Sequence, residues 1–237
     1  MKKVEFLYPE FTYLYGESFN VEYLKKCSKE IQVIETHVGE SPKFITGGAD
    51  MVYIGSMTED DQEKTIELLK PFRNFIIHAI QSGTVFVVTG NALEIFGTRI
   101  IGDDVLSDDK KEVQGLCIFD MMTVRKLREP RQNSYFLGNF SGMLTIGFRS
   151  QSSFTYSEND YSFIKVYKGS GMNPDTDKEG IHVKNFFATY SLGPFLMMNP
   201  IFTKYILRKL GLKDDLYLED HVQEVFDNKL EELRNNL

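Results

Sequence analysis

The sequence has no tryptophan, no long apolar run and only two cysteines, Cys27 and Cys117. Two cysteines are too few for a disulfide framework, and neither has the spacing of a metal site. No apolar segment approaches the roughly 18 residues that span a membrane, and no signal peptide is visible. We therefore expect a cytoplasmic protein with no membrane segment, no disulfide framework and no bound metal.

The sequence also has no excess of positively charged residues. The 237 residues carry a formal net charge of −7, and the basic pairs Lys25-Lys26 and Lys110-Lys111 are too short to form a stripe. An acidic protein repels nucleic acid unless it concentrates basic residues on one face. The glycine-rich loop that binds nucleotide phosphates, Gly-x-x-x-x-Gly-Lys-Ser/Thr, is absent as well. We expect no nucleic-acid partner and no cofactor.

The composition that is present, 42% hydrophobic and 26% charged, is typical of a globular protein. In the first half, short apolar runs alternate with helical patterns, which predicts a parallel sheet with helices on both faces. Thr58 and Asp61 mark a helix start, Pro71 should interrupt that helix, and Gly83 should end it. The expected strands here are 4–8, 31–38, 50–54 and 84–89, and the expected helices are 20–31, 58–83 and 92–96.

The second half is richer in strands, which we expect at 116–119, 143–148, 163–167 and 183–188. The last segment, 218–237, has the periodicity of a helix with one apolar stripe. Core packing is the favoured use of that stripe, and a partner contact is the alternative. No linker or repeat interrupts the chain. We therefore predict one domain over 1–237, a three-layer α/β fold with a mostly parallel sheet and added antiparallel strands.

Two strand-to-helix turns, 54–58 and 88–92, are the best candidates for chemistry, because ligands bind beyond the carboxyl ends of parallel strands. The second turn follows the clearest buried strand and has the form of a nucleophile elbow. Its tip is Gly90, which has no side chain, and Thr89 has no evident base beside it. The four histidines are more typical of packing or surface positions than of a site. They are His37, His78, His182 and His221.

Several segments, in this order and spacing, resemble the CobB/CobQ (cobyric acid synthase) branch of the class I glutamine amidotransferases. Within that branch the sequence is most similar to the glutaminase subunit of lipid II isoglutaminyl synthase, from about Phe6 to about Leu212. The resemblance implies a class I amidotransferase fold of flavodoxin-like type. The segments are 7–10, 14–16 with Asn20, 53–56, 60–63, 147–148 with Thr155, 169–173, 179–180, 189–194 and 199–200.

The chain departs from this family at the residues that carry its chemistry. Counting back from Gly97 puts the position of the catalytic cysteine at Gly90, and the position of the catalytic histidine falls at Leu192. The family's Glu-Asn-His segment is replaced by Arg149, Ser150 and Gln151. Glutamine hydrolysis in this family runs through a cysteinyl thioester with a histidine base. Losing one member of such a pair typically removes about 10⁴ of the rate.

The resemblance therefore implies a retained pocket without the known catalytic residues. We expect the pocket to bind a small anionic or amino-acid-like ligand, with Arg149 in place of an acid favouring an anion. Cys27 and Cys117, expected in a helix and a strand far from the elbow, do not substitute for the cysteine. The predicted pocket residues are Ser56, Thr89, Gly90, Asn91, Arg149, Gln151 and Ser191.

Three functions remain open at this point. The favoured one is a catalytically degenerate binding or partner subunit, with a ligase or synthetase as the partner. The second is an enzyme with altered chemistry in the same pocket, using Thr89, Ser56, Ser191 or Arg149. The third is an active glutamine amidotransferase in which the position of the catalytic cysteine has been assigned to the wrong residue. Against it, no cysteine lies at an elbow. An unrelated α/β binding protein is the remaining alternative.

Overall fold

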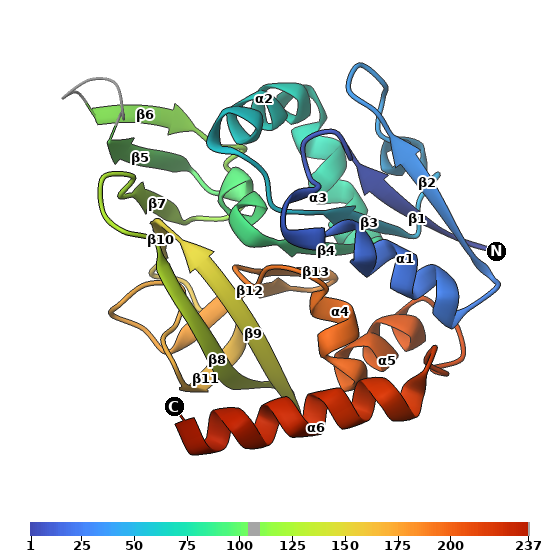
Figure 1. The fold of residues 1–237 in the computed structure, drawn as a ribbon. Helices are drawn as coiled ribbons and strands as arrows, with labels where there is room; N and C mark the ends of the chain where they lie inside the picture. The colour runs from blue at the N-terminus through green and yellow to red at the C-terminus, as the bar shows by residue number, and fades with distance from the viewer. Residues whose placement is uncertain (104–109, 237) are drawn as a thin grey trace.

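The computed structural model of the chain describes residues 1–103 and 110–236, which form a nine-stranded sheet and a smaller four-stranded sheet (Figure 1). The large sheet has the order β2-β1-β3-β4-β13-β12-β11-β8-β9. Its first five strands run parallel. They are β2 (Ile31–Thr36), β1 (Lys2–Leu7), β3 (Met51–Ile54), β4 (Val85–Thr89) and β13 (Phe186–Thr189).

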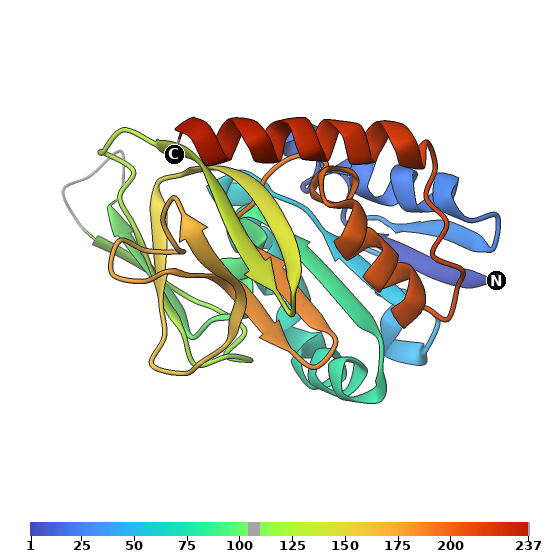
Figure 2. The ribbon, with the colours of Figure 1, turned by 90° about the horizontal axis from the view of Figure 1, so that it is seen from below.

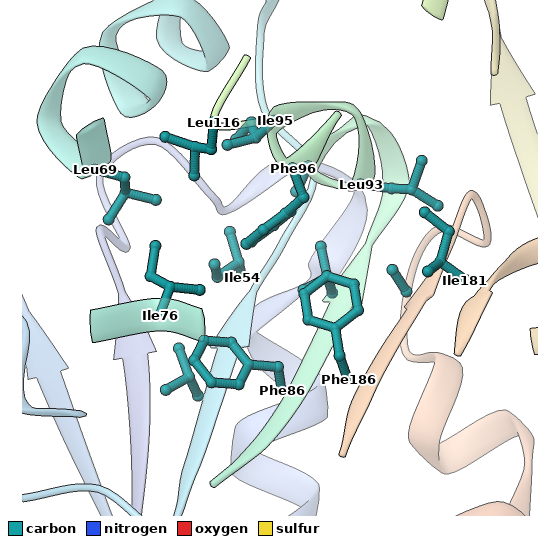
Figure 3. Close-up of a cluster of buried hydrophobic side chains, with 14 of the residues drawn as sticks. Ile54, Leu69, Ile76, Phe86, Leu93, Ile95, Phe96, Leu116, Ile181 and Phe186 are labelled. Carbon is teal, nitrogen blue, oxygen red and sulfur yellow. The ribbon is translucent and has the colours of Figure 1, made fainter. Parts of the chain in front are cut away.

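Helices cover both faces of the parallel strands, as the sequence predicted. Side chains alternate along β4, so Val85 and Val87 face one layer while Phe86 and Val88 face the other. The first layer contains α1 (Ser18–Cys27), α4 (Phe195–Met198) and α5 (Pro200–Lys209). The second contains α2 (Glu59–Leu69) and α3 (Arg73–Ser82). Figure 3 shows this second core, in which Phe86 and Phe186 lie near Ile54, Ile76 and Phe96.

The helix signals read from the sequence are confirmed. The Thr58 hydroxyl accepts a hydrogen bond from the backbone N–H of Asp61 at 3.2 Å, which caps α2. Pro71 lies in a 3₁₀ turn, η3 (Lys70–Phe72), that separates α2 from α3. Gly83 ends α3 with a φ of +110°, a conformation that glycine adopts without steric cost.

Four antiparallel strands of the second half complete the large sheet; those at 143–151 and 162–168 were predicted, and those at 132–140 and 178–183 were not. They are β12 (Lys178–Val183), β11 (Ser162–Lys168), β8 (Gln132–Phe140) and β9 (Met143–Gln151). The strand expected at 183–188 is instead the end of β12 and the start of β13, because the chain turns at Lys184 with a φ of +57°.

The last helix, α6 (Glu219–Asn236), lies along the outside of the antiparallel strands (Figure 2). Its Phe226, Leu230 and Leu233 form a buried cluster with Leu137 of β8 and Ile146 of β9. The favoured interpretation of this stripe as core packing is therefore confirmed. Two other apolar residues of the predicted stripe, Leu218 and Val225, are 55% and 52% exposed.

The smaller sheet was not predicted as such. It has the order β10-β7-β5-β6 and sits beside the large sheet in Figure 1. Its strands are β10 (Ser153–Tyr156), β7 (Met122–Arg125), β5 (Arg99–Asp103) and β6 (Lys110–Gln114). Its shortest strands have only four residues. Strand β5 lies between β6 and β7, and it pairs with β6 antiparallel and with β7 parallel. Short strands whose pairing depends on distant segments give little periodic signal.

The prediction of a strand at 116–119 is wrong. These residues form an irregular loop in which Cys117 has a φ of +52°. Their backbone N–H groups bond to carbonyls around the 3₁₀ turn η4 (Gly90–Phe96), including Leu116 N–H to Ile95 O at 2.8 Å. The apolar run thus reflects the burial of Leu116 and Phe119 against η4 and not strand pairing. The helix predicted at 92–96 is this 3₁₀ turn.

Across residues 1–103 and 110–236, no helix is both long enough and apolar enough to cross a membrane.

Candidate functional site

The chain makes a sharp turn where β4 ends. Thr89 is the last residue of the strand, and Gly90 follows with a φ of +63°. This left-handed conformation is that of a strained elbow between a strand and a helical turn. The Gly90 N–H donates to the carbonyl of Ser191, two residues beyond the end of the neighbouring parallel strand β13. The elbow therefore lies at the carboxyl edge of the parallel sheet, where the sequence placed it.

The elbow has no room for a side chain. A Cβ atom built on Gly90 would lie 2.4 Å from the Cβ of Ser56 and 2.9 Å from Cδ2 of Leu192. Gly90 and Leu192 are thus neighbours, although 102 positions of sequence separate them. Two residues with no acid–base or nucleophilic group occupy the positions that the resemblance assigns to cysteine and histidine. Ser56 makes the closest approach to the tip of the elbow.

A fully buried glutamate, Glu17, lies behind Ser56. Its carboxylate accepts hydrogen bonds from Ser56 Oγ at 3.1 Å, from Thr89 Oγ1 at 2.5 Å and from the hydroxyl of Tyr53. The backbone N–H of Gly193 donates to the same group at 3.3 Å. Burial raises the pKa of Glu17 to about 7, and these hydrogen bonds act against that rise.

A second buried glutamate, Glu94, lies beneath the other side of the site. Ser153 Oγ donates to it at 2.5 Å, Tyr190 at 3.1 Å and Gln62 Nε2 at 3.1 Å. Burial raises the pKa of Glu94, while Arg125, whose Nε lies 4.0 Å away, acts in the opposite direction. Two carboxyl groups therefore lie under the serine and tyrosine side chains of the site.

Between these networks a cavity of about 120 Å³ opens beside the elbow. Loops after β3 and β4, the start of α2 and the junction of β9 with β10 contribute its walls. Polar side chains outnumber apolar ones. The lining residues are Leu14, Tyr15, Ser56, Met57, Thr58, Glu59, Gly90, Asn91, Arg131, Ser150, Gln151, Ser152, Ser153, Tyr190 and Leu192.

The structure brings four of the predicted pocket residues to this cavity: Ser56, Gly90, Asn91 and Gln151. The Asn91 side chain is fully engaged, because its amide exchanges hydrogen bonds with the backbone of Met57 at 2.9 and 3.0 Å. Asn91 thus joins the two candidate turns to each other.

The other three predicted residues lie elsewhere. Thr89 is buried beneath the elbow and bonds to Glu17. Ser191 lines a neighbouring apolar groove of about 320 Å³ and is absent from the lining of the cavity. Arg149 is 1% exposed, and its guanidinium forms an ion pair with buried Glu179 at 3.4 Å. It also donates to Gly171 O and Ser170 Oγ.

The role given to Arg149 as an anion-binding residue therefore does not fit its position. Its N–H groups are directed at partners within the protein, and the cavity lining does not include it. The guanidinium instead neutralises Glu179, whose carboxylate holds the Thr189 hydroxyl at 3.0 Å and the Tyr190 N–H at 2.7 Å. Arg149 thereby fixes the strand end next to the elbow.

Sequence reasoning missed Glu17 and Glu94. Glu94 lies four residues after the elbow glycine in an otherwise apolar run, which is a weak signal of a buried charge. Glu17 lies between two quoted motif segments and carries no local signal. Both acquire partners from distant parts of the chain. Over residues 1–103 and 110–236, no group of three His, Cys, Asp or Glu side chains is arranged to hold a metal ion.

Comparison with known proteins supports the resemblance. Residues 3–200 match the model of the CobB/CobQ-like glutamine amidotransferase domain. The chain is 27% identical over 200 residues to the lipid II isoglutaminyl synthase (glutamine-hydrolyzing) subunit GatD of Staphylococcus aureus (strain N315), covering 83% of this chain and 79% of that protein. It is 24% identical to the GatD of Streptococcus pneumoniae (strain ATCC BAA-255 / R6), with 81% and 74% covered.

A shorter stretch of 101 residues, 42% of this chain, is 36% identical to a nucleoid-associated protein of Sulfurovum sp. (strain NBC37-1) and covers 96% of it. Among solved structures, a glutamine amidotransferase crystal structure aligns with a TM-score of 0.58 at 12% identity, covering 88% of this chain and 99% of that one. The PurLQS structure from Thermotoga maritima aligns with a TM-score of 0.55 at 10% identity, covering 97% and 99%. At these identities the structures establish the fold.

The fold, the elbow after β4 and the family match over residues 3–200 agree with one another. The chain belongs to the CobB/CobQ-like glutamine amidotransferase domain family.

Proposed function

We propose that this protein is a catalytically degenerate member of its family, without glutaminase activity, and that it acts as a binding or partner subunit. In this proposal the chain works as one amidotransferase-like domain over residues 1–237. It retains the elbow and a cavity but uses them to bind.

One observation carries the proposal: the elbow residue is Gly90, and its neighbours leave no space for a cysteine. Glutamine hydrolysis through a thioester needs a thiolate at that tip and a base within hydrogen-bond reach. Leu192 supplies no base. The two cysteines do not line this cavity; Cys27 lies in α1 and Cys117 in the loop beside η4.

A partner is part of the proposal because the two GatD relatives are named as subunits of a synthase. A synthetase or ligase is the partner class we propose. The apolar stripe of α6 does not support this idea, because its buried residues serve the core. We propose no nucleic-acid partner, since the formal net charge is −7.

Ammonia release from glutamine tests the loss of activity. The native chain, alone or with candidate ligases encoded nearby, should release no ammonia above the buffer rate. A Gly90→Cys/Leu192→His variant restores the two catalytic side chains, and a Ser56→Gly change added to it makes room for the sulfur. Clear release from the native protein would overturn the proposal.

Altered chemistry is a second candidate, and the contact between Ser56 and Glu17 favours it. Ser56 Oγ lies 3.1 Å from a carboxylate whose pKa is about 7, beside the elbow residue Gly90, to which the resemblance assigns the nucleophile. A base beside a hydroxyl can accept its proton and so activate the oxygen as a nucleophile. Labelling with a fluorophosphonate, lost in Ser56→Ala and retained in Ser150→Ala, would support this candidate. Absence of labelling in the native protein would reject it.

A further inference from the structure

The groove that Ser191 lines is large enough for a ligand of its own. Tyr15 and Leu192 line both the groove and the cavity, so the two openings adjoin. The groove has a volume of about 320 Å³, within the range of roughly 300–1,000 Å³ that small-molecule sites occupy. It lies between the outer edge of β9, at 146–148, and the segment 191–195 that leads from β13 into α4.

The Ser191 side chain is a nearly buried polar group without a partner in the protein. Ser191 is 1% exposed. Its backbone is engaged, because its N–H donates to Thr189 Oγ1 at 3.0 Å and its carbonyl accepts from Gly90. Its hydroxyl has no hydrogen bond to any residue of 1–103 and 110–236, where Gln151 Oε1 is the one unpartnered side-chain atom that is fully enclosed. The Ser191 hydroxyl therefore reaches accessible space, and Ser191 lines the groove.

The edge of β9 supplies a second free donor on the groove side. The Asn199 side chain bonds to both the N–H and the carbonyl of Ile146, at 2.8 and 2.9 Å, so the Ile146 backbone faces away from β8. Because this direction alternates along a strand, the Phe148 backbone faces the same way. Its carbonyl accepts from the Leu192 N–H at 2.8 Å, whereas its N–H has no acceptor among the described residues. Two donors thus remain for an acceptor on a ligand.

The walls of the groove favour an uncharged, flat ligand. None of the described residues that line it has a charged side chain, and a charged ligand would lose its hydration there without compensation. Lys229, whose Nζ lies 3.8 Å from the ring centre of Tyr135, is paired with Glu232 at 2.8 Å. The rings of Tyr135 and Phe148, with centroids 4.9 Å apart, offer aromatic surface for a ring to pack on.

We propose that this groove binds a small, uncharged aromatic ligand through a carbonyl oxygen, which accepts a hydrogen bond from the Ser191 hydroxyl. The Phe148 N–H is the second donor of the site. The inference goes beyond the proposed function, because the groove is a separate opening and its ligand does not depend on whether glutamine is hydrolysed at the elbow. It gives Ser191, which the sequence assigned to the pocket, a ligand contact in the groove instead of the cavity.

Titration of the full chain with acetophenone, followed by the backbone NMR signals of Phe148 and Ser191, tests this proposal. Acetophenone combines one aromatic ring with one carbonyl group. A ligand of this size binds with a dissociation constant on the order of 1 mM. The signal of Thr58, which lines the cavity and not the groove, distinguishes the two openings. Saturable shifts at Phe148 and Ser191, and none at Thr58, are expected.

Two matched ligands separate the contributions of the carbonyl and of charge. Benzene keeps the ring without an acceptor and should bind at least about threefold more weakly. Sodium benzoate has nearly the shape of acetophenone with a negative charge, and should bind about tenfold more weakly or less. Equally tight binding of benzene or of benzoate would overturn the proposal. Absence of saturable shifts with acetophenone at Phe148 and Ser191 would overturn it as well.

A pair of variants locates the contact. Ser191→Ala should weaken acetophenone binding about threefold to tenfold and leave benzene binding unchanged, because only the hydrogen bond is lost. Ser162→Ala is the matched control and should leave binding unchanged, since Ser162 lies on β11 and lines neither opening. Unaltered acetophenone binding in Ser191→Ala would overturn the assigned contact. If Ser191→Ala does not fold, the comparison of acetophenone with benzene on the native chain decides.

Discussion

Ser56 occupies the space that a side chain on Gly90 would need, since the two Cβ positions would be 2.4 Å apart. Ser56 is itself held by the buried carboxylate of Glu17 at 3.1 Å. The absence of a side chain at Gly90 and the position of Ser56 are therefore coupled. Placing a nucleophile at the elbow requires a change at both residues.

Gly90→Ala should destabilise the protein by about 3 kcal/mol, from the left-handed backbone conformation and from overpacking against Ser56. Gly47→Ala is a matched control, because Gly47 has a φ of +70° and no atom within 4 Å of a built Cβ. It should cost only the conformational part, about 1 kcal/mol. Urea unfolding measures both values. Adding Ser56→Gly should recover stability in the Gly90→Ala background, and additive effects would contradict the coupling.

Glu17 should make stability depend on pH between about 4.5 and 7. Its pKa is about 7 in the folded protein and near 4.5 when unfolded, so the folded state binds more protons in this range. The stabilisation is complete below pH 4.5 and is lost as pH rises through 7, by about 3 kcal/mol. Unfolding free energies measured from pH 5 to 8 should show this decline in the native chain and a shallower one in Glu17→Gln. Equal slopes would rule out the assignment to Glu17.

The buried ion pair of Arg149 and Glu179 should be needed for stability and not for ligand binding. Arg149→Met leaves a buried carboxylate without its counter-charge and should cost about 3–5 kcal/mol in urea unfolding. Lys165→Met, which breaks the exposed pair with Asp177, should cost at most about 1 kcal/mol. If Arg149→Met lowers the free energy of unfolding by only about 1 kcal/mol, other groups must stabilise the buried Glu179 carboxylate.

Two adjacent residues of α6 separate core packing from a partner contact. Phe226 is 3% exposed in the cluster with β8 and β9, whereas Val225 is 52% exposed. Phe226→Ala should lower the free energy of unfolding by about 3–5 kcal/mol, and Val225→Ala by less than about 0.5 kcal/mol. Thermal and urea denaturation of the isolated chain measure both. Similarly small decreases in the free energy of unfolding for the two variants would indicate that α6 contributes little to the core and serves as a partner contact instead.

Local sequence features determined much of the fold. Alternating apolar runs and helical patterns, with Thr58, Pro71 and Gly83 as boundaries, were enough to predict the parallel half and its helices. These signals act over a few residues, so they are readable from the chain alone. The small sheet and the loop at 116–119 were not predicted, because burial against distant segments gives no periodic pattern that distinguishes a short strand from a buried loop.

The sequence by itself determined that Gly90 and Leu192 stand where the resemblance places a cysteine and a histidine. Only the tertiary structure decided where the polar side chains point. It turned Arg149 to Glu179, 30 positions away, and it set Glu17 behind Ser56 and left Gln151 Oε1 without a partner. The sequence gives the identity of each side chain. Its burial and its hydrogen-bond partners depend on segments that meet only when the protein folds.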